Sequence, residues 1–154
     1  MIETIEPLLA SHPVFKSLDT AHIKLLLGCA SNVKFDAGQF IFHEGEEANI
    51  FYVIRHGRIV VEAFSPVHGP IGIQTCTDGD VLGWSWLVAP FRWRFDAKAS
   101  EPTRLIALDG KCLRTKCEQD HDLGYEMMKI FTDIIADRLE ATRLQLLDIY
   151  RASP

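Results

Sequence analysis

Residues 35–59 read FDAGQFIFHEGEEANIFYVIRHGRI, and no other stretch indicates the fold class as directly. Short runs of aromatic and β-branched residues alternate in it with turns that contain glycine, at Gly38, Gly45 and Gly57. Glycine suits a tight turn because it adopts a positive φ without the steric cost of a Cβ. The pattern is typical of short strands joined by turns.

The same alternation continues toward the C-terminus as far as residue 109. Apolar runs of strand length, separated by turn residues, predict strands at Phe40–Phe42, Ile50–Ile54, Ile59–Phe64, Ile71–Thr75, Trp93–Ala99 and Arg104–Leu108. Regularly spaced short strands favour an all-β sandwich or barrel. We therefore predict an antiparallel β-roll, of jelly-roll or cupin-like type, over residues 32–109.

Helical patterns flank the predicted roll, so the fold class is mainly β with flanking helices (α+β). Residues 1–31 are predicted to be helical, with Asp19 as a helix cap. Residues 110–154 are predicted to end in one long helix. Asp120 and Asp122 lie at its start, where a helix cap and the positive end of the helix dipole favour an acidic residue. The whole chain, residues 1–154, is interpreted as a single domain.

The long helix carries a 3-4 repeat that runs to the end of the chain. Its positions are Tyr125, Met128, Thr132, Ile135, Leu139, Thr142, Leu146 and Ile149. Such a repeat is the seam expected of a two-helix coiled coil and predicts a homodimer. A second apolar stripe, from Met127 to Ile134, is free to pack on the roll. The alternative is a helix that is buried more deeply in its own domain.

Composition excludes several classes of function. The chain has 154 residues, of which 47% are hydrophobic and 24% charged, and its net charge is −5. Nucleic-acid surfaces are usually basic, so we expect no direct nucleic-acid binding. The longest apolar runs, such as Ile50–Ile54, fall far below the roughly 20 residues that span a bilayer. The N-terminus lacks the basic region of a signal peptide, so we expect a cytoplasmic protein without a membrane segment.

Cysteine and histidine spacing gives no metal pattern. Cys112 and Cys117 form a C-x4-C pair without matching ligands, and the other two cysteines, Cys29 and Cys76, are isolated. We interpret all four as reduced and mostly buried. No H-x-H pair, esterase elbow or phosphate-binding loop occurs. We expect no catalytic residue, no metal and no cofactor; haem bound through Cys76 is a minor alternative.

Several motifs together resemble a known family. Residues 12–15 (HPVF), 35–46, 51–59, 79–83 (GDVLG) and 138–142 (RLEAT) are similar, in this order, to segments of the cyclic nucleotide-binding domains of the catabolite-activator type. The resemblance implies a β-roll with an internal ligand pocket and a ligand-responsive C-terminal helix. In the family's transcription factors a helix-turn-helix follows that helix. Because this chain ends at Pro154, we expect no DNA-reading element.

The segment that resembles the family's phosphate-binding cassette departs from the pattern. Trp84 stands where the family has an acid, and Trp93 stands where it has an arginine, with Arg92 and Arg94 on either side. Since strand side chains alternate, Trp93 is expected to point inward and both arginines outward. Losing a charge-assisted contact to a phosphate costs about 2–5 kcal/mol, so we predict weak or absent binding of cyclic AMP and cyclic GMP.

The sequence therefore predicts a non-enzymatic, ligand-binding regulatory module. The candidate ligand-binding residues are Gly83, Trp84, Ser85, Trp86, Arg92, Trp93, Arg94, Phe95 and Thr142. The aromatic rings either plug the interior or line a pocket for an apolar or aromatic small molecule. Two alternatives stay open. A bulge at Pro90–Arg92 could turn Arg92 or Arg94 inward and give a cyclic-nucleotide sensor, or the chain could be a ligand-free protein-interaction module.

Overall fold

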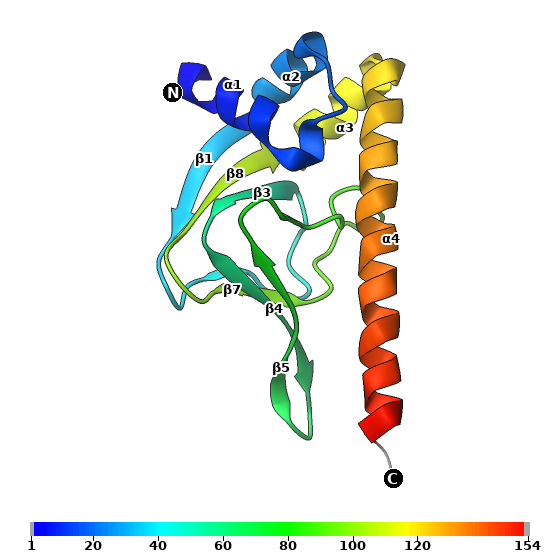
Figure 1. Ribbon diagram of the computed structural model, residues 1–154. Helices are drawn as coiled ribbons and strands as arrows, with labels where there is room; N and C mark the ends of the chain where they lie inside the picture. The colour runs from blue at the N-terminus through cyan, green and yellow to red at the C-terminus, as the bar shows by residue number, and fades with distance from the viewer. Residues whose placement is uncertain (1, 153–154) are drawn as a thin grey trace.

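The computed structural model describes residues 2–152; residues 1, 153 and 154, at the ends of the predicted domain, lie outside the described residues. The centre is a β-roll of two four-stranded antiparallel sheets, with helices at one end and a long helix along one side (Figure 1). This arrangement confirms the predicted fold class.

Each sheet combines strands that are distant in sequence. The first has the order β1-β8-β3-β6, and its strands are β1 Ala30–Phe35, β8 Thr103–Asp109, β3 Ile50–His56 and β6 Val81–Leu82. The second has the order β2-β7-β4-β5, and its strands are β2 Phe40–Phe42, β7 Asp96–Ala99, β4 Arg58–Ser65 and β5 Gly69–Thr77. The β4–β5 hairpin extends beyond the roll, beside the lower part of the long helix (Figure 1).

Polar side chains cap the first turns of several helices. The helices are α1 Ile2–Ser11, the 3₁₀ helix η1 Pro13–Phe15, α2 Thr20–Leu27, α3 Gly110–Gln119 and α4 His121–Ala152. The Asp19 carboxylate accepts a hydrogen bond from the His22 amide, and the Asp120 carboxylate accepts from the amides of Asp122 and Leu123. Each cap satisfies amides that the first turn leaves unpaired. No helix of residues 2–152 has the length and apolar character that crossing a membrane requires.

Three segments differ from the predicted strands. The sequence prediction missed β1 and β6. Half of the residues of β1 are polar, and its pairing with the central strand β8, from Ala30↔Leu108 to Phe35↔Thr103, stabilises it. The strand predicted from Trp93 begins only at Asp96. Residues 93–95 leave the sheet because Trp93 instead exchanges backbone hydrogen bonds with the turn at Gly45 and Glu46.

The apolar side chains form two cores. One lies between the N-terminal helices, the first sheet and α4, and it includes Phe15, Phe51, Trp86 and Phe131. The other fills the inside of the roll, and it includes Phe42, Ile54, Ile59, Trp93 and Leu105. The face of α4 from Met127 to Ile134 packs against the first core, as its stripe predicted.

The interpretation of all four cysteines as reduced is wrong for two of them. Cys29 and Cys112, separated by 83 positions, form a disulfide with their Cα atoms 5.7 Å apart. Cys76 is a buried free thiol and Cys117 a half-buried one. The pairing escaped the sequence analysis because only the β1–β8 ladder brings the two residues together.

Candidate functional site

The cassette, residues 83–95, connects β6 to β7 by turns and lies between the roll and the helices. Its second half is tied to the turn after β2: the Ala48 amide donates to the Phe91 carbonyl at 2.7 Å, and the Trp93 amide donates to the Glu46 carbonyl at 2.9 Å. Phe91 has a φ of +57°, and the Ala89–Pro90 bond is cis. The two hydrogen bonds hold the second half of the cassette against the turn after β2.

The three tryptophans of the cassette point to three different places. Trp93 is 4% exposed and stacks on Phe42, with ring centroids 3.6 Å apart. Trp86 is fully buried in the other core, against Phe51 and Phe131. Trp84 stays half-buried. Only Trp84, therefore, remains at a surface that a ligand can reach.

The Trp93 side chain fills the interior of the roll next to Gly83, the first residue of the cassette. Gly83 has a φ of +96°, and a Cβ at this position would lie 2.6 Å from Cη2 of Trp93. The indole therefore packs directly on the Gly83 backbone, which only glycine permits. The two neighbouring arginines are exposed: Arg92 donates to the Gly45 carbonyl at 3.2 Å, and the Arg94 guanidinium lies 5.3 Å from the Trp84 ring. Neither arginine reaches the interior.

A cavity of about 280 Å³ lies beside the cassette, between the roll and α4. Its lining comes from three places: β4 and β5 with Val61, Ile73 and Gln74, the cassette region with Val81, Leu82, Gly83, Trp84 and Phe95, and α4 with Ile134, Arg138, Thr142 and Gln145. Four predicted residues meet here: Gly83, Trp84, Phe95 and Thr142. The other predicted cassette residues lie elsewhere: Ser85, Trp86 and Trp93 are buried, and Arg92 and Arg94 are exposed.

Polar groups of α4 border this cavity. The Thr142 hydroxyl donates to the Arg138 carbonyl of its own helix at 2.8 Å, and its lone pairs can still accept. The Gln145 amide donates to the Ile73 carbonyl at 2.8 Å and so ties α4 to the β4–β5 hairpin. In the core, the Ser85 hydroxyl and the Trp86 indole N–H are buried without a hydrogen-bond partner among the described residues.

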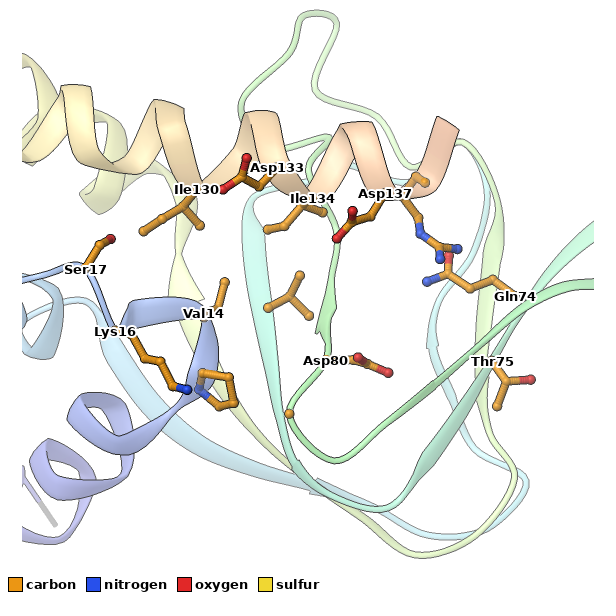
Figure 2. Close-up of a pocket in the computed structure, with 14 residues that line it drawn as sticks. Val14, Lys16, Ser17, Gln74, Thr75, Asp80, Ile130, Asp133, Ile134 and Asp137 are labelled. Atoms are coloured by element: carbon orange, nitrogen blue, oxygen red, sulfur yellow. The ribbon is translucent and has the colours of Figure 1, made fainter. Parts of the chain in front are cut away.

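A second and larger hollow, of about 480 Å³, adjoins the first along α4 (Figure 2). Figure 2 shows α4 on one side with Ile130, Asp133, Ile134 and Asp137, the N-terminal segment with Val14, Lys16 and Ser17, and β5 and the following turn with Gln74, Thr75 and Asp80. The two hollows share Gln74, Val81, Ile134 and Arg138. Together they form a strip, the α4 strip, that is apolar near Trp84 and charged near Asp80.

Arg138 is the cation that borders both hollows of the α4 strip, whereas Lys16 lines only the larger one, and Arg138 was not among the predicted site residues. Its side chain is half-buried and lines both hollows. Among residues 2–152 its guanidinium has no hydrogen bond or ion pair. Burial, helped by Asp80, raises the pKa of the nearby Cys76 thiol to about 12, while the charge of Arg138 works against this rise. A half-buried guanidinium without a partner is suited to receive an acceptor group of a ligand.

The outer face of α4 is apolar and open. The predicted seam residues Tyr125, Met128, Ile135, Leu139, Leu146 and Ile149 are exposed. Thr132 and Thr142 lie on the same face, and each hydroxyl donates to the carbonyl four residues earlier. Within the described residues, no three His, Cys, Asp or Glu side chains converge as metal ligands would.

Comparisons with known proteins agree with the fold. A family model of the cyclic nucleotide-binding domain matches residues 32–120. A cyclic nucleotide-binding domain from Methylobacillus flagellatus superposes with a TM-score of 0.80 at 16% identity, over 96% of this chain and 83% of that chain. The sensor domain of the transcriptional regulator DNR from Pseudomonas aeruginosa gives a TM-score of 0.73 at 18% identity, over 90% of this chain and 93% of that chain.

A third relative has a higher sequence identity. The regulatory subunit of a cAMP-independent protein kinase A from Trypanosoma cruzi, bound to guanosine, is 25% identical with a TM-score of 0.65. The match covers 86% of this chain and 51% of that chain, so the present chain spans about half of that subunit. Among curated protein sequences, none matches this chain.

Proposed function

Because the chain belongs to the cyclic nucleotide-binding domain family, whose model matches more than half of it, we propose that it is a non-enzymatic regulatory module that binds a flat aromatic ligand without a cyclic phosphate. The ligand occupies the α4 strip, where it contacts the cassette and α4 together. Binding of cyclic AMP and cyclic GMP is weak or absent.

The position of Trp93 carries this proposal. It stands where the resemblance places the family's phosphate-binding arginine, and it is 4% exposed against Phe42. A cyclic phosphate inside the roll would meet indole and phenyl rings, with Arg92 and Arg94 both outside. Losing the charge-assisted contact costs about 2–5 kcal/mol, which is roughly a 30-fold to several-thousand-fold loss of affinity.

The lining of the α4 strip favours a nucleoside-like ligand. Trp84 and Phe95 offer faces and edges for a flat ring, and Arg138 offers donors for a carbonyl or ring nitrogen. The volume of about 280 Å³ lies just under the roughly 300–1,000 Å³ of most ligand pockets. The kinase regulatory subunit from Trypanosoma cruzi supports this class, because guanosine carries no phosphate.

Calorimetric titration with guanosine, cyclic AMP and cyclic GMP tests the proposal. We expect guanosine to bind and both cyclic nucleotides to bind at least about 30-fold more weakly. Trp84→Ala and Arg138→Gln should each lower guanosine affinity about tenfold, since each removes a contact to the ligand. Arg92→Ala, which removes an exposed cation of the same cassette, is the control and should change nothing.

Two results would overturn the proposal. Micromolar binding of a cyclic nucleotide that Arg138→Gln abolishes would make Arg138 the phosphate-binding residue. A panel of small metabolites that leaves the melting temperature unchanged would favour the ligand-free interaction module, because a ligand of the native state must stabilise it.

The exposed seam of α4 supports a homodimer as the working form of the module. Six large apolar side chains lie on one face of a 32-residue helix, in the 3-4 spacing of a coiled coil. An apolar face of this length is costly to leave in water. A second copy covers it with an identical face, which a two-fold axis allows.

Two matched leucines test the dimer. Leu139 lies on the seam and is 54% exposed, whereas Leu147 lies off the seam and is 50% exposed. Light scattering after size exclusion should show that Leu139→Glu converts dimer to monomer, while Leu147→Glu leaves the dimer intact. Equal behaviour of the two variants, or a monomeric parent protein, contradicts the proposed seam.

A further inference from the structure

The Cys29–Cys112 disulfide joins two segments that the backbone already holds together. Cys29 directly precedes β1, and Cys112 lies in the first turn of α3. The Asp109 amide donates to the Cys29 carbonyl at 2.9 Å, and Ala30 pairs with Leu108 at the end of the β1–β8 ladder. The bond can therefore open and close again without unpairing β1 from β8.

Helix α3 is held between the disulfide and the cassette. Positions 110 and 114 share one face of a helix, and position 112 lies on the opposite face. On the cassette side, the Arg114 guanidinium donates to the Trp86 carbonyl and lies 4.5 Å from the Phe91 ring. A Cβ on Gly110 would meet Cβ of Trp86 at 3.0 Å. On the other side, Cys112 fastens α3 to the segment before β1.

The remaining boundary between α3, α4 and the cassette is loosely filled. A cavity of about 460 Å³ lies among them, although Gly124 of α4 packs on the Cys117 backbone of α3. The cavity is lined by Trp86, Leu87, Arg114, Cys117, Glu118, His121, Gly124, Met127, Met128 and Phe131. Met side chains change shape easily, so this space tolerates a shift of α3. Arg114 supplies the side-chain hydrogen bond and the ring contact from α3 to the cassette, and Leu113 of α3 lies in the same core as Trp86.

We infer that the disulfide controls the candidate site: its reduction releases the first turn of α3, weakens the hold of Arg114 on the cassette, and lowers ligand affinity in the α4 strip. The part about ligand affinity rests on the proposed function. In the chemical step an external dithiol gives two electrons and two protons to the S–S bond; this bond breaks, two cysteine thiols form, and the dithiol becomes a disulfide.

The surroundings of the sulfurs fit an external reductant. Cys112 is half-buried and Cys29 is 8% exposed, so an external thiol approaches the bond from the Cys112 side. Cys117 lies five positions later on the same helix, but burial raises the pKa of its thiol, and Asp120 and Glu118 raise it further. It is therefore a poor nucleophile for the disulfide.

Hydrogen–deuterium exchange of the ligand-free protein, oxidised and after dithiothreitol, tests the coupling. Reduction should speed exchange of amides 84–93 about three- to tenfold, while β4 stays unchanged as an internal reference. Arg114→Gln should speed the same amides about tenfold with the disulfide intact, because a hydrogen bond from a charged donor is lost. Cys112→Ser removes the disulfide and should show the exchange rates of the reduced parent. Cys117→Ser keeps the disulfide and is the matched cysteine control.

Three outcomes decide the matter. Faster exchange confined to residues 28–31 and 110–113, with amides 84–93 unchanged, overturns the coupling. Alkylation that labels Cys29 and Cys112 fully even after treatment with an oxidant overturns it as well. If exchange in the cassette speeds up on reduction but the protein binds guanosine in neither state, the coupling stands and the proposed function is refuted. If guanosine binds, the affinity for guanosine should fall about three- to tenfold on reduction.

Discussion

The inside of the roll and the α4 strip share one cassette, yet the first is filled and the second is open. Inside the roll, Trp93 packs on the Gly83 backbone and stacks on Phe42. Nine residues earlier, Trp84 stays half-buried beside a cavity of about 280 Å³ that Arg138 also lines. The same residue type thus closes one space and borders another.

On the proposed function, the difference shows how a family site can change its ligand without losing its architecture. Trp93 fills the interior of the roll, and Arg92 and Arg94, its neighbours in sequence, are exposed. The cavity along α4 keeps space and a cation. On the proposed function, recognition of the ligand then depends more on α4 than on the cassette. The ligand and the dimer partner therefore contact the same helix.

The largest expected effect comes from removing the ring that fills the interior. Trp93→Ala should lower the free energy of unfolding by about 3–5 kcal/mol, because it leaves a cavity among packed rings. Trp84→Ala, the same change at the open strip, should cost about 1 kcal/mol. Urea denaturation of both variants measures the difference. Equal losses would mean that the inside of the roll is no more tightly packed than the strip.

A methyl group at the border between the two regions should have a smaller effect. Gly83→Ala places a Cβ 2.6 Å from the Trp93 ring at a φ of +96°, and we expect a loss of about 2–3 kcal/mol. Gly38→Ala is the matched control, since its φ is +90° and no atom lies within 4 Å of the added Cβ. It should lose only about 1 kcal/mol, from the backbone alone. Denaturation midpoints that coincide for the two variants would show that Trp93 does not press on Gly83.

Local signals predicted most of the fold and part of the candidate site. Glycine turns and alternation located β3, β4 and β8, because both signals act within a few residues. β1 escaped because its stability comes from β8, far away in sequence. Arg138 could have been found, since it lies four positions after Ile134 and so extends the stripe that faces the roll. The disulfide could not, because 83 positions separate its cysteines and only the folded sheet joins them.

The smallest expected effect on stability comes from His12, a buried residue beside the α4 strip. Its imidazole is 6% exposed; Nδ1 accepts from the Val14 amide and Nε2 contacts the Ile54 carbonyl, each at 3.2 Å. Since Nδ1 accepts, the ring is neutral, with its proton on Nε2. Burial lowers the pKa of His12 below its usual 6.5, although the Ile54 carbonyl and Asp80 oppose the shift.

This histidine makes the wall of the strip sensitive to acid. Because the pKa of His12 is lower in the folded state, the unfolded chain takes up the proton first, so stability is full above pH 6.5 and falls as the pH drops toward the folded value. The slope from one group is at most about 1.4 kcal/mol per pH unit. Denaturation of His12→Gln between pH 7.5 and 5 should give a flatter profile than the parent, whereas Gly83→Ala should shift the whole profile down at an unchanged slope. If the stability of His12→Gln falls with pH as steeply as that of the parent, burial does not shift the pKa of His12. The imidazole is then hydrated, and the strip is open to water on its N-terminal side as well.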